Sequence, residues 1–156
     1  MLNAEKKNYR VLTVKPIENG KAEIAGLENQ RVQVRLGETE YSVFERSILD
    51  LLEADAWPIG MDVADLEATL FDCDEAIFFA SDDMDKVLDY TKNLPCKDDC
   101  VVGGLVWAVN ESLETLGKIG DYMAIIYPQL SFLYEAVNTL REGKCFYLYL
   151  AMKKEE

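Results

Sequence analysis

Acidic residues gather in one stretch of the chain, and their carboxylates are the side chains best placed to do chemistry. Residues 50–89 contain thirteen Asp and Glu residues and a single base, Lys86, so this segment carries a net charge of −12. The whole chain of 156 residues has a formal net charge of −13. Clustered carboxylates can bind a metal ion, transfer protons, or contact a basic partner. The sequence therefore has to be tested against each of these three uses.

One acidic motif suggests phosphoryl chemistry. The stretch "TLFDCDEAIF" resembles the first motif of haloacid-dehalogenase-type phosphatases, an aspartate pair that follows an apolar strand. The resemblance implies that Asp72 is a nucleophile and Asp74 an acid. The rest of the pattern departs from that family, with Ala76 in place of Thr or Val, and only Asp121 to supply a later acidic cluster. A small carboxylate- or metal-dependent enzyme of this phosphatase-like kind is an alternative hypothesis.

Two further metal patterns are incomplete. "DCDEAIFFASDD" has Asp at the first and third positions of a calcium loop but lacks the glycine at the sixth and the Glu at the twelfth. The four cysteines at 73, 96, 100 and 145 are predicted to be free thiols, and the sequence leaves open whether Cys96 and Cys100 pair. We predict neither a metal site nor a cofactor.

The chain contains no histidine. That absence excludes the Ser-His-Asp and Cys-His nucleophile pairs within this chain and removes the most common general base. No other nucleophile–base pattern takes their place. The sequence therefore predicts no catalytic residue and a protein that is not an enzyme.

A basic aromatic surface is a separate possibility. Arg31 and Arg35 on one strand, with Tyr147 and Tyr149 on another, would suit single-stranded nucleic acid. Arginine on the solvated face of a strand is also ordinary, and a charge of −13 repels phosphates. Direct binding of nucleic acid is therefore not predicted.

The acidic segment itself is the predicted binding surface. On a helical wheel of residues 62–80, Leu66, Leu70, Cys73 and Ile77 fall on one side and the acids on the other. The predicted partner-binding residues are Asp62, Asp65, Glu67, Asp72, Asp74, Glu75, Phe78, Asp82, Asp83, Asp85 and Asp89. Phe78 is either an aromatic anchor among these acids or a core residue. The competing interpretation is that the acids only solvate the surface.

Size, acidity and the lack of catalytic motifs give the chain a class-level likeness. In these three respects it resembles small phage and mobile-element proteins that inhibit restriction or CRISPR enzymes, some of them by imitating nucleic acid. The resemblance implies an inhibitor whose partner is a basic, nucleic-acid-handling protein. Besides the enzyme hypothesis, an oligomeric structural or assembly subunit that buries its Phe and Tyr surfaces remains a second alternative.

Length and hydropathy predict one α+β domain over residues 1–156. The N-terminus has no apolar signal region, and the longest apolar run, "VVGGLVWAV" at 101–109, is about half of what crosses a bilayer. We expect a cytoplasmic protein with no membrane partner.

Strands are expected at both ends of the chain. Alternation, turn residues and the hairpin dipeptide "NG" at 19–20 predict a four-stranded antiparallel meander over 9–18, 21–27, 31–36 and 39–44. In the third strand, Val32, Val34 and Leu36 should face the core. The apolar "CFYLYLAM" predicts a last strand that joins this meander. The expected fold is an antiparallel sheet of about five strands from residues 8–45 and 145–153, packed against a helical middle section.

The middle of the chain is predicted to be helical because its apolar residues recur with a period near 3.6. Ser42 and Glu45 form a possible capping box, Asp62 can cap the second helix, and Ser81 or Asp82 the third. The predicted helices span 44–56, 62–77, 84–91, 102–116 and 130–140, with a short helix at 121–127 before Pro128 or a kink there.

Overall fold

The computed structural model is a mixed α and β fold built on one large sheet. It describes residues 2–5, 11–18, 20–27, 30–53, 63–71, 73–94, 101–138 and 143–153. The predictions for Asp62, Asp72, Cys96 and Cys100 lie outside these residues.

The N-terminal half of the sheet is the predicted antiparallel meander, formed by β1 (Leu2–Glu5), β2 (Val11–Glu18), β3 (Lys21–Leu27) and β4 (Gln30–Arg35). Glu18 pairs with Lys21 across the expected two-residue turn, where Gly20 has a φ of 75°. The inward orientation of Val32, Val34 and Leu36 is confirmed, because all three are buried. The predicted strand at 39–44 is wrong: a helix begins at Tyr41, and β1 supplies the fourth strand.

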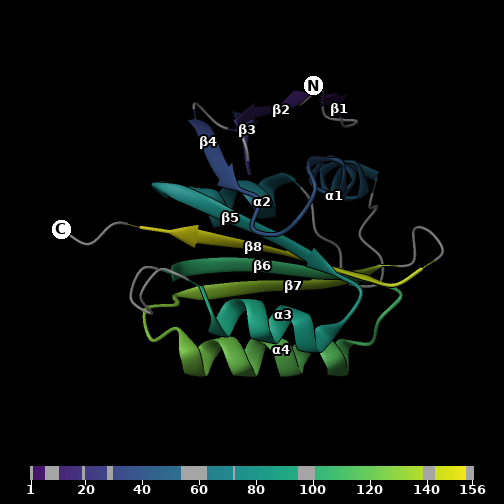
Figure 1. Ribbon diagram of the computed structural model, residues 1–156, viewed down its shortest axis with the longest axis vertical. Helices are drawn as coiled ribbons and strands as arrows, with labels where there is room; N and C mark the ends of the chain where they lie inside the picture. Colours follow the sequence, from purple (N-terminus) through teal and green to yellow (C-terminus); the bar gives the residue numbers. More distant parts are fainter. Residues whose placement is uncertain are drawn as a thin grey trace.

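The second half of the sheet is formed by β5 (Glu75–Ser81), β6 (Val101–Val109), β7 (Phe132–Asn138) and β8 (Cys145–Met152). The strand order across all eight strands is β1-β2-β3-β4-β5-β8-β6-β7. β8 runs antiparallel to both of its neighbours, whereas the pairs β4–β5 and β6–β7 are parallel. Consequently the C-terminal ends of β4, β5, β6 and β7 all lie at the same end of the sheet (Figure 1).

The last strand is confirmed as a strand, but its predicted neighbours were wrong. β8 lies between β5 and β6 and does not pair with the meander. Its residues Phe146 to Ala151 are all buried, with helices on both sides of the sheet. A strand that is apolar on both faces is most stable at the centre of a covered sheet, and the middle of the chain provides the two strands that flank it.

Helices cover both faces of this sheet (Figure 1). α1 (Tyr41–Glu53) and α2 (Val63–Leu70) pack on one face, where Phe44 and Leu66 are completely buried. α3 (Met84–Lys92) and α4 (Leu113–Ile126) pack on the other, where Val87 and Ile119 are completely buried. None of the helices in the described part of the chain has the length and apolarity needed to cross a membrane.

Three of the predicted helices are wrong in part or in full. α2 begins near the expected position but ends at Leu70, and residues 75–81 form β5. The stretches predicted as helices over 102–116 and 130–140 contain β6 and β7, and α4 is longer than the short helix expected at 121–127. β5 and β6 are buried on both faces, and a continuous apolar run of this kind fits a helical wheel as well as a strand.

Candidate acidic interface

The structure separates the predicted binding residues into three groups. Asp65 and Glu67 lie on α2, and Asp74 and Glu75 lie at the start of β5. Asp82, Asp83, Asp85 and Asp89 lie beyond the end of β5 and on α3. Because β5 has seven residues, the second and third groups are separated by about 20 Å along the strand.

The predicted helix over residues 62–77, which would have placed its acids on one face, is therefore wrong beyond Leu70. A buried strand occupies the middle of the acidic segment, with α2 on one face of the sheet and α3 on the other. Phe78 is part of that strand and is completely buried, with its ring 4.9 Å from the ring of Tyr149 and 5.4 Å from that of Phe44. Phe78 is thus a core residue and not a surface anchor.

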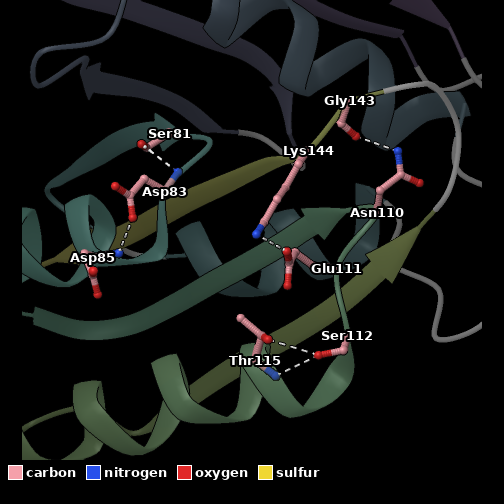
Figure 2. Close-up of polar contacts among 9 residues, drawn as sticks. All are labelled: Ser81, Asp83, Asp85, Asn110, Glu111, Ser112, Thr115, Gly143 and Lys144. Atoms are coloured by element: carbon pink, nitrogen blue, oxygen red, sulfur yellow. Dashed lines mark hydrogen bonds and ion pairs between the residues drawn. The ribbon is translucent and has the colours of Figure 1, made fainter.

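The four aspartates around the start of α3 do lie together, and all four are exposed. The backbone N–H of Asp83 donates to Ser81 Oγ at 3.1 Å, and Asp83 Oδ1 accepts from the N–H of Asp85 at 2.9 Å (Figure 2). Asp83 is therefore the N-cap, one or two residues after the predicted caps Ser81 and Asp82. Negative charge near a helix N-terminus is also stabilised by the helix dipole, which favours Asp85 in the first turn.

Two further exposed acids from a different part of the chain join this group. Glu38 and Glu40 flank Thr39, whose Oγ1 accepts a hydrogen bond from Ala80 N at 3.2 Å. That bond holds the turn after β4 against the end of β5. Gly37, in the same turn, packs so closely on the ring of Tyr90 in α3 that a Cβ there would lie 2.5 Å from the tyrosine oxygen. Sequence reasoning missed Glu38 and Glu40 because β4 and β5 pair only in the folded chain.

We refer to these six exposed residues as the acidic end: Glu38, Glu40, Asp82, Asp83, Asp85 and Asp89. Within the described residues, none of their carboxylates forms an ion pair with a lysine or arginine. By contrast, Glu75 in the second group pairs with Arg35 at 2.6 Å. The acidic end is thus an exposed group of negative charges that forms no ion pair in the described part of the chain.

A lysine lies beside the acidic end and responds to its charge. Lys144 Nζ is 2.5 Å from Oε1 of Glu111 (Figure 2). Glu111 lies two residues after the end of β6. The hydrogen bond to Glu111 raises the pKa of Lys144, and the charges of Glu111, Asp83 and Asp82 raise it further, although burial opposes the shift. The same pair lowers the pKa of Glu111, chiefly through its hydrogen bond from Lys144. Lys144 is therefore already bound to Glu111.

The loop that carries Glu111 is held at both ends (Figure 2). Asn110 has a φ of 58°, a left-handed conformation that asparagine tolerates, and its Nδ2 donates to the carbonyl of Gly143 at 2.5 Å. Ser112 is the N-cap of α4, with its Oγ accepting from Thr115 N at 3.1 Å. Asn-Glu-Ser directly after a strand indicates such a junction, but the apolar run at 101–109 does not distinguish a strand from a helix.

The chemistry of the acidic end is that of hydrogen-bond acceptors and fixed negative charge. Carboxylates presented on a folded surface can accept hydrogen bonds from the guanidinium or ammonium groups of a partner. No cluster of three or more Asp, Glu or Cys side chains in the described ranges has the geometry to hold a metal ion. Cys73 and Cys145 carry thiols that form no disulfide, as predicted for these two of the four cysteines.

The basic aromatic surface considered from the sequence does not form. Tyr147 and Tyr149 are completely or almost completely buried in the centre of the sheet, whereas Arg31 is exposed on the meander. Burial raises the pKa of Tyr149, and its hydroxyl lies 2.5 Å from Ser47 Oγ. Neither ring can stack on a nucleic-acid base.

Comparison with known proteins gives this chain no family. No family model matches the sequence, and a search of curated proteins finds no significant relative. The function must therefore be argued from the site alone.

Proposed function

We propose that the protein binds a basic, nucleic-acid-handling protein through the acidic end and inhibits it. The observation that carries the proposal is that six exposed acids from two segments of the chain lie at one end of the sheet, where no lysine or arginine among the described residues forms an ion pair with them. A surface of this sort is complementary to the lysines and arginines with which proteins bind phosphates. A protein bound there competes with nucleic acid for the same groups.

Local structural roles explain only part of this charge. Asp83 caps α3, and Asp85 is favoured in its first turn. Asp82, Asp89, Glu38 and Glu40 have no such role, and their mutual repulsion is a cost to the folded state. A basic partner would offset that repulsion on binding, which is the physical reason to prefer a binding surface over a merely solvated one.

The position on the fold supports the proposal further. The acids stand on the turn after β4, the junction after β5 and the first turns of α3, all attached to the end of a packed sheet. A rigid base keeps the charges in a fixed pattern, so less conformational entropy is lost when a partner binds. Under this proposal recognition is electrostatic and mainly increases the association rate.

The experiment compares two variants with the same net charge. One carries Asp82→Asn, Asp85→Asn and Asp89→Asn at the acidic end, and the matched control carries Asp65→Asn, Asp74→Asn and Asp121→Asn elsewhere. Each loses three of the negative charges in the sequence. The tagged proteins are used to capture partners from a native lysate at low salt, and the bound proteins are eluted with salt and assayed for nucleic-acid binding.

We expect the wild type and the control to capture the same basic protein and the acidic-end variant to lose most of it. Added DNA should displace the captured protein, and affinity should fall as salt rises, because exposed charges are screened over about 8 Å at physiological ionic strength. If both triple variants retain the captured protein equally, the proposal is contradicted and the acids only solvate the surface.

A further inference from the structure

β7 is the last strand of the sheet, and no strand in the described part of the chain pairs with its outer edge (Figure 1). On its inner side it pairs with β6 from Phe132 to Asn138 without a register shift. A regular edge strand of this length presents a row of free backbone N–H and C=O groups to which another strand can add. The opposite edge is β1, which has only four residues. β7 is therefore the edge better suited to bind an added strand.

Two acids lie together at this edge. Glu135 is the only charged residue of β7, and its carboxylate lies so close to α4 that a Cβ added to Gly120 would collide with it. Asp121, exposed on the same helix, is near enough for its charge to act on Glu135. Burial and the charge of Asp121 together raise the pKa of Glu135, so the fold disfavours its charged form. Among the described residues, no lysine or arginine forms an ion pair with either acid.

These two acids determine the kind of strand that can add to β7. An inward-pointing charge on an edge strand hinders unwanted pairing. Directly paired residues on adjacent strands have their Cβ atoms about 5 Å apart, so an apolar or acidic residue opposite Glu135 would bury its carboxylate further without a partner. A second copy of this chain would add the repulsion between two charges of −13. A lysine or arginine opposite Glu135 would instead provide a cation for both acids.

The other surroundings of β7 leave the edge accessible and partly apolar. On the side of the sheet opposite Glu135, Tyr134 is 37% exposed, and its ring lies 5.3 Å from that of Phe132. On the side of Glu135, Gly117 lies about 60° around α4 from Gly120. A Cβ added to Gly117 would meet nothing within 4 Å. An added strand can therefore place apolar side chains against Tyr134 and a long basic side chain beside α4.

We propose that β7 binds an extended basic segment of a partner protein, which adds to the sheet as a further strand and places a lysine or arginine beside Glu135 and Asp121. Backbone hydrogen bonds supply affinity, and the basic side chain supplies specificity. Apolar residues at alternate positions of the segment contact Tyr134 and Phe132 on the other side of the sheet. The proposal goes beyond the proposed function and does not rest on it, since β7 carries none of the acidic end.

The test uses a short, capped and fluorescently labelled peptide in which valine and lysine alternate, so that all its lysines lie on one side of an extended strand. Its binding to the full chain is measured by fluorescence anisotropy, and amide hydrogen exchange locates the bound peptide. One control peptide carries methyl groups on its backbone nitrogens, which keep the charge but cannot donate the hydrogen bonds of a strand. A second control has glutamate in place of lysine.

We expect the lysine peptide to bind and to slow amide exchange in residues 132–138. The methylated peptide should bind about tenfold more weakly or worse, because several backbone hydrogen bonds are lost, and the glutamate peptide should not bind. Glu135→Gln should raise the dissociation constant of the lysine peptide about tenfold, because it removes one member of a partly buried charge pair. The matched control is Glu38→Gln, which removes one charge at the acidic end and should change the affinity little.

Several results would overturn the proposal. The lysine peptide could fail to bind or to slow exchange in β7, or the methylated peptide could bind as tightly, which would indicate attraction to an acidic surface without strand pairing. Equal weakening by Glu135→Gln and Glu38→Gln would indicate the same. Tighter binding by Glu135→Gln would show that Glu135 only hinders pairing at this edge. None of these results bears on capture of a partner through the acidic end, so failure of one proposal is distinguishable from failure of the other.

Discussion

The two faces of the sheet differ in whether polar side chains are buried beneath their helices. Beneath α1, Asp50 is completely buried and accepts a hydrogen bond from Tyr147 Oη at 2.9 Å, while Arg46 Nε lies 2.9 Å from its other oxygen. Ser47, also buried, contacts the hydroxyl of Tyr149 and donates to the carbonyl of Phe44. On the other face, the core beneath α3 and α4 is built mainly of aliphatic side chains, and the carboxylates are exposed or, as in Glu135, partly buried at its border.

The difference shows that position, more than residue type, decides what an acid does here. Asp50 and Asp89 both belong to the acidic segment of the sequence. Asp50 is matched by partners because an unpaired charge in the interior is costly. Asp89 is exposed, where water solvates a carboxylate without a protein partner. The net charge of the segment therefore overstates the charge available to a binding partner.

The largest loss of folding stability is expected from truncating a core side chain, Phe78. Phe78→Ala should lower the free energy of unfolding by about 3–5 kcal/mol, because it leaves a cavity between α1 and the centre of the sheet. Phe71→Ala is the control, since its ring is 72% exposed, and we expect a change within about 0.5 kcal/mol. Urea unfolding followed by circular dichroism measures both. Similar losses in the two variants would contradict the assignment of Phe78 to the core.

The meander shows how much of the fold the sequence could predict. In β3 and β4 buried residues alternate with more exposed ones, so alternation and the dipeptide at 19–20 gave three of the four predicted strands and the inward orientation of Val32, Val34 and Leu36, whereas the fourth, at 39–44, was wrong. The central strands are covered on both faces and show no alternation. In β6, with the sequence VVGGLVWAV, eight of nine residues are buried, and a run of this kind carries no periodicity that separates a strand from a helix.

The candidate site was predictable to a similar degree. Asp82, Asp83, Asp85 and Asp89 are close in sequence, so they remain close in the fold whatever their secondary structure. Asp65 and Asp74 lie apart from them because β5, whose apolar run also fits a helical wheel, comes between. Glu38 and Glu40 reached the site only through the parallel pairing of β4 with β5. A contact between strands so far apart in sequence leaves no local signal.

A smaller effect is expected from the buried polar group itself. Asp50→Ala removes the acceptor of the hydrogen bond from the buried Tyr147 hydroxyl. Removing one partner of a buried hydrogen bond costs about 1–3 kcal/mol. Arg46 adds little to the loss, because its side chain is 44% exposed and can be hydrated. The double variant Asp50→Ala with Tyr147→Phe should recover part of the stability in urea unfolding, and a strictly additive double variant would show that the two groups are not coupled.

The smallest effects concern how two glutamates respond to pH. Burial raises the pKa of Glu135, with Asp121 as the second cause, so the fold holds its proton more tightly than the unfolded chain does. Its contribution to stability therefore falls as the pH rises through the ordinary glutamate range towards the raised value. We expect Glu135→Gln to be more stable than the wild type at neutral pH and similar to it in acid, where the carboxyl is protonated in both states.

Glu111 should show the opposite dependence. The hydrogen bond from Lys144 is the main cause of its lowered pKa, so its stabilising contribution is present above the ordinary glutamate pKa and is lost as the pH falls through the lowered value. Glu111→Gln should therefore be less stable than the wild type at neutral pH and approach it in acid. Urea unfolding at a series of pH values measures both variants. If the unfolding free energies of both variants depend on pH as that of the wild type does, neither carboxyl has a different pKa in the folded and unfolded chain. If the two variants deviate from the wild type with opposite slopes, the fold disfavours the charged form of Glu135 and favours that of Glu111.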